Sequence, residues 1–546
     1  MAGGVRFGRL RRSLALGALF LGVTLVMVRP NPAHLGDRLP ANTGDPALVV
    51  WTLSWDVHAV ARHPTGYLDA NIFWPHRDTL AYADSLVPLA PVYGVLHAVT
   101  GSWPLALLLL QLALTMLSLG TAFALARWLT GRDDAALLGA IAYTFSGFAL
   151  AQWGHIQLQT LGLLPLAVLL LFRVLDEPRA TTAVLLGLVS VAVALSSLYY
   201  GLAYGVAAVV IVAAHGLRQR GRVDPRVLAM LGVAAAVIAV LVWPELRART
   251  RLADEGFRRP LVPGYGLHGI DFLRPAFESY LWRPMEHALS RADEAHRFFP
   301  GAVSAVLAVA GLVAGRRRPR IVAVAAAGAV AAVLAGGARI GPVRGPFGLL
   351  YDHVPGFGQA RVASRLAVVT TLAVAMLAAT GFAVVAERIG DRRARVAAVV
   401  AAVLMLGELA APVAWADLPH DRETLAVYRE LAQRPAGVVL ELPIMVPHEN
   451  AFRWATVEAP RMVYGSFDWH PRVNGYSGFV PPGYEDDTVL LNTFPSPPAL
   501  LRARQLGVRY VVFHAGAPAG YAATRYGRAW LADLGPQPST PPNGRG

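Results

Sequence analysis

The sequence predicts a mainly α-helical integral membrane protein with about eleven transmembrane helices and a C-terminal exterior α/β domain. Hydrophobic residues make up 55% of the 546 positions and charged residues only 15%, whereas soluble domains carry about a quarter charged residues. Apolar runs such as 103–126 and 366–386 are long enough to cross roughly 30 Å of hydrocarbon as helices. Basic residues gather in short links between these runs, as expected for a chain that crosses a membrane repeatedly.

The arginine-rich links predict the topology. They are residues 6–12, 127–132, 173–179, 218–226, 316–320 and 388–395. Basic links favour the cytoplasmic side, so an even number of spans must separate each neighbouring pair. The predicted spans are residues 13–28, 103–126, 135–151, 158–171, 183–195, 202–214, 227–242, 302–314, 321–335, 366–386 and 396–414. The N-terminus is then cytoplasmic and the C-terminal region exterior, and adding or removing one pair of spans leaves every loop on its side.

The large polar segments all fall on the exterior in this topology. They are residues 29–102, 243–300, 336–365 and everything from 415 onward. The first span is preceded by arginines like a signal peptide, but no small-x-small cleavage pattern follows it, so we expect it to remain as a helix. Small cytoplasmic links and large outer loops indicate that the protein acts outside the membrane.

The region 415–534 has the residue pattern of an α/β domain. We expect helices and strands at residues 421–433, 438–442, 499–506 and 508–513, from helical spacing and from β-branched runs. Residues 535–546 are rich in Pro and Gly and predict a disordered tail.

Composition also excludes several functions. The net charge of +14 is explained by the cytoplasmic links, so nucleic acid is not an expected partner. The absence of cysteine excludes disulfides, thiolate metal sites and cysteine nucleophiles. The chain contains no HExxH, Walker A or GxSxG motif, and no paired-histidine motif predicts zinc.

Three stretches carry a resemblance to a known superfamily. They are NIFWPH at 71–76 followed by LAY at 80–82, the loop 473–484, and LGVRYVV at 506–512. With the large acidic first outer loop and about eleven spans, the chain resembles the GT-C superfamily of polyprenyl-phosphate-dependent glycosyltransferases, and also YfhO-type membrane glycosylation proteins. The resemblance implies inverting transfer of a hexose or pentose from a polyprenyl-phosphate sugar to an envelope glycan, lipid or protein. The reaction would occur at the outer face of a bacterial plasma membrane.

The resemblance also implies that a carboxylate in the first outer loop acts as general base. Asp45, in Gly-Asp-Pro soon after the first span, is the first candidate, and Asp56 is the second. The alternative is that either aspartate caps a short interfacial helix. Many GT-C enzymes have two neighbouring acids here, but Asp45 has none, so a divalent cation is left open and no cofactor is certain. The acidic run 485–487 predicts a solvated turn.

The phosphate of the donor requires a cation near the membrane face. Arg361 and Arg365 precede the tenth span and could bind phosphate; they would point the same way if this segment is helical. Arginine side chains extending to lipid head groups are the alternative. His155 lies in a polar outer turn and is a further candidate for the donor site, although an interfacial turn also accommodates a histidine.

The loop 474–484 is rich in aromatic residues that suit stacking on sugars. Asn474, Tyr476 and Tyr484 are therefore predicted to bind substrate, and the alternative is a lid packed on the core of the domain. Two other functions remain open, namely a lipid-linked sugar transporter and a non-catalytic assembly factor for an envelope glycan. Transporters usually carry ionisable residues within spans and internal repeats, which this sequence lacks.

Overall fold

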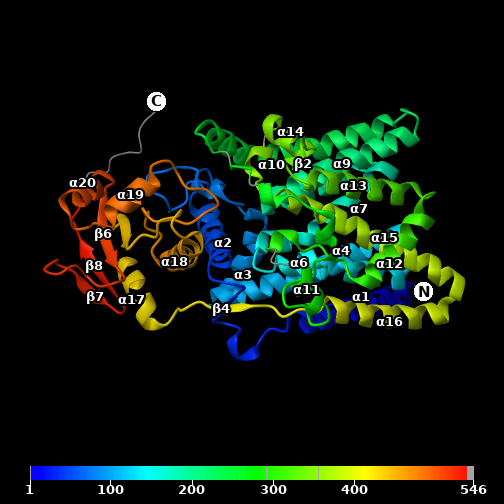
Figure 1. Cartoon of the computed structure of the whole chain (residues 1–546), viewed down its shortest axis with the longest axis horizontal. Helices are drawn as coiled ribbons and strands as arrows, with labels where there is room; N and C mark the ends of the chain where they lie inside the picture. The colour runs from blue at the N-terminus through cyan, green and yellow to red at the C-terminus, as the bar shows by residue number, and fades with distance from the viewer. Residues whose placement is uncertain (1, 258, 262, 290–292, 355, 538–546) are drawn as a thin grey trace. The chain divides into compact units, whose positions relative to one another are not determined.

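The computed structural model describes residues 2–257, 259–261, 263–289, 293–354 and 356–537, and the chain forms two compact units (Figure 1). Unit 1 comprises Met1–Asn31, Leu110–Leu246 and Arg258–Val413, and unit 2 comprises Pro32–Leu109, Arg247–Phe257 and Ala414–Gly546. Residues 32–102 of the segment predicted to be the first outer loop and the C-terminal region therefore belong to one unit. Residues 538–546 of the predicted tail lie outside the described residues.

Unit 1 is built from helices that run side by side (Figure 1). They are α1 (Ala2–Val28), α4 (Trp103–Thr130, which begins in unit 2), α5 (Asp133–Thr144), α6 (Gly147–Ala151), α7 (Leu163–Asp176), α8 (Ala180–Ser196), α9 (Leu198–Arg218), α10 (Pro225–Asp254, which ends in unit 2), α11 (Arg283–Leu289), α12 (Ala302–Gly315), α13 (Pro319–Ala335), α14 (Pro346–His353), α15 (Val368–Ile389) and α16 (Asp391–Leu409). A two-stranded ribbon, β2 (Arg339–Ile340) with β3 (Val343–Arg344), precedes α14.

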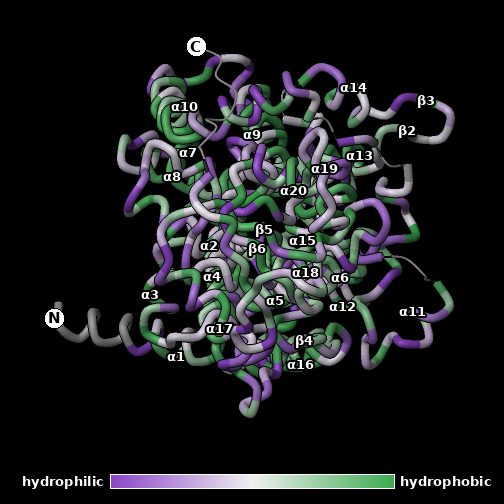
Figure 2. The backbone as a smooth tube through the Cα atoms, turned by 90° about the vertical axis from the view of Figure 1, so that its left-hand side faces the viewer, coloured by the Kyte–Doolittle hydropathy of each residue, from purple (hydrophilic) through white to green (hydrophobic). Residues whose placement is uncertain are grey.

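Seven helical segments among the described residues are long and apolar enough to span a membrane. Shorter apolar helices include Ala180–Ser196, Ala302–Gly315 and Pro319–Ala335. Every predicted span except 396–414 overlaps one of these segments; that span overlaps α16, which ends at Leu409. Figure 2 shows hydrophobic residues along the helices and hydrophilic residues mainly in the connections. The predicted class, a mainly helical membrane protein with a small β-containing region, is confirmed.

Several predicted helix boundaries differ from the structure, and two of the differences have a clear local cause. The run 135–151 is divided at Phe145, and Ser146 caps α6 by accepting a hydrogen bond from the Ala149 main chain. Helix α10 continues past residue 242 to Asp254, because the polar segment after Pro244 is still composed of good helix formers. Loss of hydropathy therefore marks the end of the apolar run rather than the end of the helix.

Ion pairs connect five of the six arginine-rich links, each between an arginine of one link and an acidic residue in or directly next to another. They are Arg12 with Asp133, Arg132 with Asp391 at 3.1 Å, Arg320 with Asp176 at 2.6 Å, and Arg318 with Glu387 at 3.8 Å. These pairs require the links at 6–12, 127–132, 173–179, 316–320 and 388–395 to lie at the same end of the helices of unit 1. The predicted topology also requires these links to lie at one end of the helices, because an even number of spans separates each neighbouring pair.

The tightest helix contact in unit 1 joins α12 to α15 and depends on glycine. A Cβ atom on Gly311 would lie 1.9 Å from the Leu377 carbonyl oxygen, and one on Gly381 would lie 2.0 Å from the Leu307 carbonyl oxygen. Only residues without a side chain allow the two backbones to approach this closely, as is common between membrane helices.

Unit 2 combines helices with a four-stranded mixed sheet (Figure 1). Its helices are α2 (Asp45–Arg62), α3 (Ala90–Thr100), α17 (Arg422–Leu431), α18 (Ala451–Tyr464), α19 (Tyr484–Leu491) and α20 (Pro497–Gln505). Its sheet has the order β5 (Val438–Leu442), β6 (Val508–Phe513), β8 (Ala529–Asp533), β7 (Thr524–Tyr526), with β5 and β6 parallel and the other pairs antiparallel. The predicted strands 438–442 and 508–513 are confirmed with these bounds. The predicted turn at 485–487 was wrong, since these acids form the first turn of α19, where carboxylates interact favourably with the helix dipole.

The first outer loop is built into this unit by main-chain pairing. Strand β1 (Arg38–Pro40) pairs with β4 (Trp415–Asp417). Further along, the Phe73 main chain donates to the Asn474 carbonyl at 3.1 Å and Trp74 donates to Arg472 at 2.8 Å. The Val473 main chain in turn donates to Val439 of β5 at 3.0 Å. Residues 71–74 therefore pair with residues 472–474, which in turn pair with strand β5 of the sheet.

A buried ionic network holds this junction. The Arg472 guanidinium donates to Glu441 at 3.0 Å and to Asp468 at 2.7 Å, and all three side chains are at most 1% exposed. His514 lies 2.8 Å from the second Glu441 oxygen. Burial alone would raise the pKa of Glu441, but the His514 hydrogen bond and the Arg472 charge lower this pKa to about 2. Glu441 is consequently an ionised carboxylate at neutral pH.

Candidate functional site

Asp45 occupies the first turn of α2 and is followed by Pro46, a residue suited to the start of a helix. The turn is fixed by Asn42, whose side-chain oxygen accepts from the Gly44 main chain at 2.7 Å. A Cβ atom on Gly44 would lie 2.9 Å from the Ala455 side chain, so the start of α2 packs closely on α18. Asp45 is half-buried, and it lies at the N-terminus of the helix without capping it, because Gly44 is the cap residue and no side chain caps this end.

Tyr476 from the predicted aromatic loop contacts Asp45. Its hydroxyl donates to Asp45 Oδ1 at 2.6 Å, a short distance typical of a bond to a charged acceptor. The Tyr476 ring packs edge-on against Trp454 with centroids 4.8 Å apart, and Trp454 Nε1 donates to the Gly475 carbonyl at 2.9 Å. The loop is thereby held so that its tyrosine reaches the aspartate, a pairing that the sequence did not predict.

Asn474 and Tyr484 are buried and hold the loop from inside. The Asn474 side chain accepts from the Glu441 main chain and donates to the Glu441 carbonyl, both at 2.8 Å. Tyr484 accepts from the Gly475 main chain at 3.2 Å, and its ring packs edge-on against Phe73 with centroids 4.9 Å apart. These contacts are those of a lid packed on its own domain, the alternative that the sequence left open.

Asp56 lies in the same helix as Asp45 but in a different environment. Its side chain is fully buried, and eleven residues of α-helix place it about 16 Å from Asp45 along the axis. The two candidate bases therefore cannot serve one reaction centre together. Asp78, another acid of the first loop, is paired with Arg251 at 2.7 Å.

His155 lies in unit 1, in the turn before the short helix η4 (Ile156–Gly162), a turn that the sequence predicted to be on the outer side. Its Nε2 is 3.9 Å from a Glu294 carboxylate oxygen. Gln152 in the same turn donates to the Glu294 carbonyl at 2.7 Å, and Gln159 donates to the Gln152 carbonyl at 2.9 Å. The turn is thus tied to η7 (Glu294–His296), a helical turn that also packs on η9 (Ala363–Ala367).

Arg365 is part of η9 and points toward α9. Its guanidinium carbon lies 5.2 Å from the centre of the Tyr199 ring, and the Tyr199 hydroxyl accepts from the Val362 main chain at 3.2 Å. The Arg365 Nε atom is buried and lacks a hydrogen-bond partner among the described residues. A buried N–H group without a partner is costly, so it is a candidate for binding a ligand.

Arg361 does not share this environment. It precedes η9 in a non-helical segment and is exposed, so the condition for the two arginines to point the same way is not met. The sequence also gave no role to Ser197 and Ser364, whose buried hydroxyls lack partners among the described residues and which lie in the same segments as Tyr199 and Arg365. The signal for Ser197 was the polar interruption of the apolar block 183–214, whereas Ser364 lies in the polar segment 336–365 and had no such signal.

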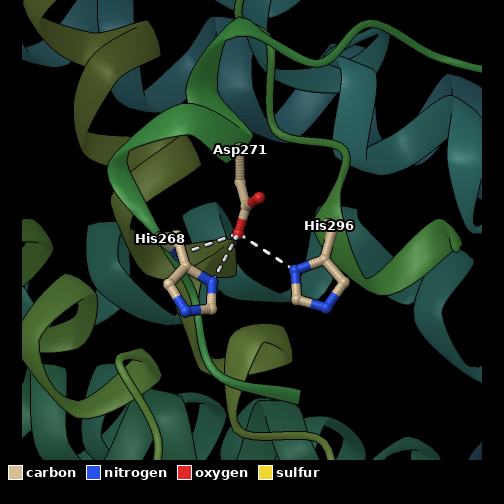
Figure 3. Close-up of side chains that lie close together, drawn as sticks. All are labelled: His268, Asp271 and His296. Atoms are coloured by element: carbon tan, nitrogen blue, oxygen red, sulfur yellow. Dashed lines mark hydrogen bonds and ion pairs between the residues drawn. The ribbon is translucent and has the colours of Figure 1, made fainter. Parts of the chain in front are cut away.

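A cluster that no sequence motif indicated lies in the segment of chain that connects α10 to α12. His268, Asp271 and His296 come together (Figure 3), and among the described residues they form the one group of three or more His, Asp or Glu side chains that could hold a metal ion. The sequence shows no paired-histidine motif here because His296 is far from His268 along the chain. Burial would raise the pKa of Asp271, but hydrogen bonds from His296 and from the His268 main chain outweigh it and lower this pKa.

The comparisons with known proteins concern the fold. No protein-family model matches the chain, and no curated protein matches it. The solved structure of the arabinofuranosyltransferase AftD from Mycobacteria is similar over 97% of this chain and 42% of AftD, with a TM-score of 0.56 at 16% identity. The chain thus spans less than half the length of AftD.

Two further structures are similar with lower scores. The oligosaccharyltransferase of Archaeoglobus fulgidus has a TM-score of 0.49 at 12% identity, over 91% of this chain and 69% of that one. ArnT from Cupriavidus metallidurans has a TM-score of 0.46 at 12% identity, over 96% and 98%. The fold assignment rests on AftD, and with it the predicted GT-C resemblance is confirmed at the level of the fold.

Proposed function

We propose that this chain is a membrane glycosyltransferase that moves a sugar from a polyprenyl-phosphate donor to an envelope acceptor. The acceptor is a glycan, lipid or protein at the outer face of a bacterial plasma membrane, with the N-terminus cytoplasmic. The GT-C fold and the apolar helices support a membrane enzyme of this class. AftD is described as an arabinofuranosyltransferase, and a pentose is accordingly among the sugars to be tested.

Asp45 is the proposed general base. A hydroxyl oxygen of the acceptor attacks the anomeric carbon as its proton passes to the Asp45 carboxylate. The bond from the anomeric carbon to the phosphate oxygen breaks on the opposite side, so the configuration inverts and polyprenyl phosphate leaves with the electron pair. A carboxylate has about four lone-pair positions, so the bond from Tyr476 can orient Asp45 while another lone pair accepts the proton.

The observation that carries the proposal is the 2.6 Å bond from Tyr476 to Asp45. It joins the first outer loop to the aromatic loop 474–484, the two segments that the sequence independently suggested for catalysis and substrate binding. Asp45 is also half-buried, so a substrate can reach it, whereas Asp56 is fully buried. Asn474 and Tyr484 are assigned to positioning Tyr476.

Arg365 is the proposed ligand of the donor phosphate. The departing phosphate carries negative charge, and an arginine with a buried, unsatisfied N–H group supplies both charge and a donor. The Tyr199 ring lies against the Arg365 guanidinium and limits the movement of the arginine side chain. His155 and the exposed Arg361 are assigned supporting roles at the same outer side of unit 1, for the donor head group.

The test is donor consumption by purified full-length protein in liposomes. A panel of labelled polyprenyl-phosphate pentoses and hexoses is supplied, and transfer of label from lipid to water or acceptor is followed. We expect Asp45→Asn to abolish transfer and the matched exposed variant Asp486→Asn to retain it. If Asp45→Asn keeps full activity, or if Asp56→Asn alone abolishes it, the assignment of the base is refuted. If the wild type consumes none of the donors, the transferase proposal fails and the assembly-factor function is favoured.

A further inference from the structure

The cluster of His268, Asp271 and His296 is a built site rather than a surface coincidence. Asp271 is fully buried, and its Oδ1 accepts from the Arg274 guanidinium. Its Oδ2 accepts from the His268 main chain at 2.8 Å and lies 3.0 Å from His296 Nδ1. The two imidazole rings flank this carboxylate (Figure 3). Every oxygen of Asp271 is thereby held in a fixed direction.

Both nitrogens of His296 face groups that can only accept hydrogen bonds. Nε2 lies 2.7 Å from the Gly264 carbonyl oxygen and Nδ1 lies 3.0 Å from Asp271 Oδ2. The contact with Gly264 places a proton on Nε2, since a carbonyl cannot donate. The Nδ1 lone pair of that tautomer would then face a carboxylate oxygen at close range and be repelled by it. A cation must therefore lie between His296 and Asp271, either a proton or a metal ion.

The surroundings have the features of a metal site. A histidine that binds a metal through one nitrogen usually donates from the other to a carbonyl or carboxylate, which fixes its tautomer and orientation; the Gly264 carbonyl does this for His296. A third donor, His268 Nδ1, lies 3.8 Å from the same Asp271 oxygen. The His268 side chain is 65% exposed, so an ion can enter from solvent and keep a water ligand.

The distances suit a small tetrahedral ion. Zinc bonds of about 2.0–2.2 Å imply ligand atoms about 3.3–3.5 Å apart, and the two distances to Asp271 Oδ2, 3.0 and 3.8 Å, bracket that value. All three ligand atoms lie within 4.8 Å of one another. Two imidazoles and one carboxylate suit zinc and its neighbours in the transition series, whereas calcium and magnesium prefer oxygen ligands.

We propose that His268 Nδ1, Asp271 Oδ2 and His296 Nδ1 bind one zinc-like divalent transition-metal ion, with water completing the coordination. The ion replaces the proton between His296 and Asp271. It ties the segment that begins at His268 to η7, which packs on η9 and on the turn of His155. This site is independent of the proposed transfer reaction and is tested by binding alone.

The experiment is metal titration of purified, tag-free full-length protein in detergent after treatment with a chelator. Zinc binding is measured by calorimetry, and cobalt is used as a coloured probe of four-coordinate geometry. We expect one zinc ion per chain at this site and no comparable binding of magnesium or calcium. His268→Ala and His296→Gln should each weaken zinc binding by more than about tenfold, since loss of an outer-shell partner alone costs 10–100-fold. His287→Ala is the matched control, because His287 is an exposed histidine of the neighbouring helix α11.

The outcomes are separable. If zinc does not bind stoichiometrically, a proton occupies the position between His296 and Asp271 and the proposal is overturned. His287→Ala should bind zinc as the wild type does. If His268→Ala also does so, the ion is bound elsewhere and the proposal is equally overturned. Should His296→Gln fail to fold, His268→Ala decides the matter, since the exposed His268 side chain contributes only a capping hydrogen bond to the short helix η6 (Gly269–Leu273). A thermal melt of each variant in chelator reports its folding, and zinc should raise the Tm of the wild type but not that of His268→Ala.

Discussion

Removing the Tyr476 hydroxyl tests the proposed catalytic geometry directly. In Tyr476→Phe the ring and its packing on Trp454 remain, but the 2.6 Å bond to Asp45 is lost. Hydrogen bonds to charged groups contribute about 1.5–3 kcal/mol. If that energy positions the base in the transition state, and each 1.36 kcal/mol is tenfold in rate, kcat should fall by about ten- to a hundredfold. Because Tyr476 is assigned to Asp45 rather than to the sugar, the KM for the donor should change little.

The controls use the same chemical change and the same assay of label transfer. Tyr510→Phe removes a hydroxyl of unit 2 that donates to the neutral Pro435 carbonyl at 2.8 Å, and it should leave kcat unchanged. Combined with Asp45→Asn, Tyr476→Phe should cause no further loss of residual activity, because its effect acts through Asp45. Two results would show that the bond has no part in the reaction. One is full activity in Tyr476→Phe, and the other is a double variant whose loss of kcat equals the product of the two single losses.

Three further predictions concern the donor site and the buried network. Arg365→Met should raise the KM for the lipid donor by about tenfold or more, because a charge-assisted contact is lost, and Arg361→Met should raise it less; the reverse order would contradict the assignment. Arg472→Met removes the guanidinium that pairs with both Glu441 and Asp468 and should lower the free energy of unfolding by about 3–5 kcal/mol. The loss would be visible as a lower Tm in tryptophan fluorescence, whereas an unchanged Tm would refute the network's role. The pKa of Glu441 is lowered to about 2, with burial opposing and the His514 bond and the Arg472 charge favouring the charged form. Its stabilisation is therefore fully present above its ordinary pKa of 4.5 and is lost as the pH falls from there toward 2. The loss is on the order of 3 kcal/mol, and Glu441→Gln should flatten the fall of Tm in this range.

The elements that the sequence predicted well are those with local signals. Strands β5 and β6 are buried, β-branched runs, and helix α17 follows Asp421, whose side chain accepts from the Thr424 main chain as a cap. The hairpin of β7 and β8 was missed, although Gly527 lies in its turn at a φ of +61°. Its strands are short and partly polar, so their alternation was too weak to recognise.

The candidate site was predicted only in part, because its contacts join distant segments. Asp45 and Tyr476 were chosen separately, from a resemblance and from an aromatic loop, and nothing in their spacing indicates that they touch. The same limit applies to the pair of His268 and His296, which tertiary folding brings to one carboxylate. The helical relation proposed for Arg361 and Arg365 failed because the helical turn η9 begins only at Ala363. The conformation of η9 depends on its contacts with Tyr199, and the spacing of residues in the sequence does not indicate such contacts.

The position of Asp45 depends on residues about 410 to 431 positions further along the chain. Gly44 packs on Ala455 of α18, and Tyr476 holds the carboxylate across 431 residues. The main-chain bonds between residues 71–74 and 472–474 add a second connection between the same two parts of the chain. The first outer loop therefore cannot acquire its geometry alone, even though it contains the proposed base. It follows that a substitution such as Gly44→Ala, which forces a contact of 2.9 Å with Ala455, should impair catalysis through α18 as strongly as a change in the aromatic loop does.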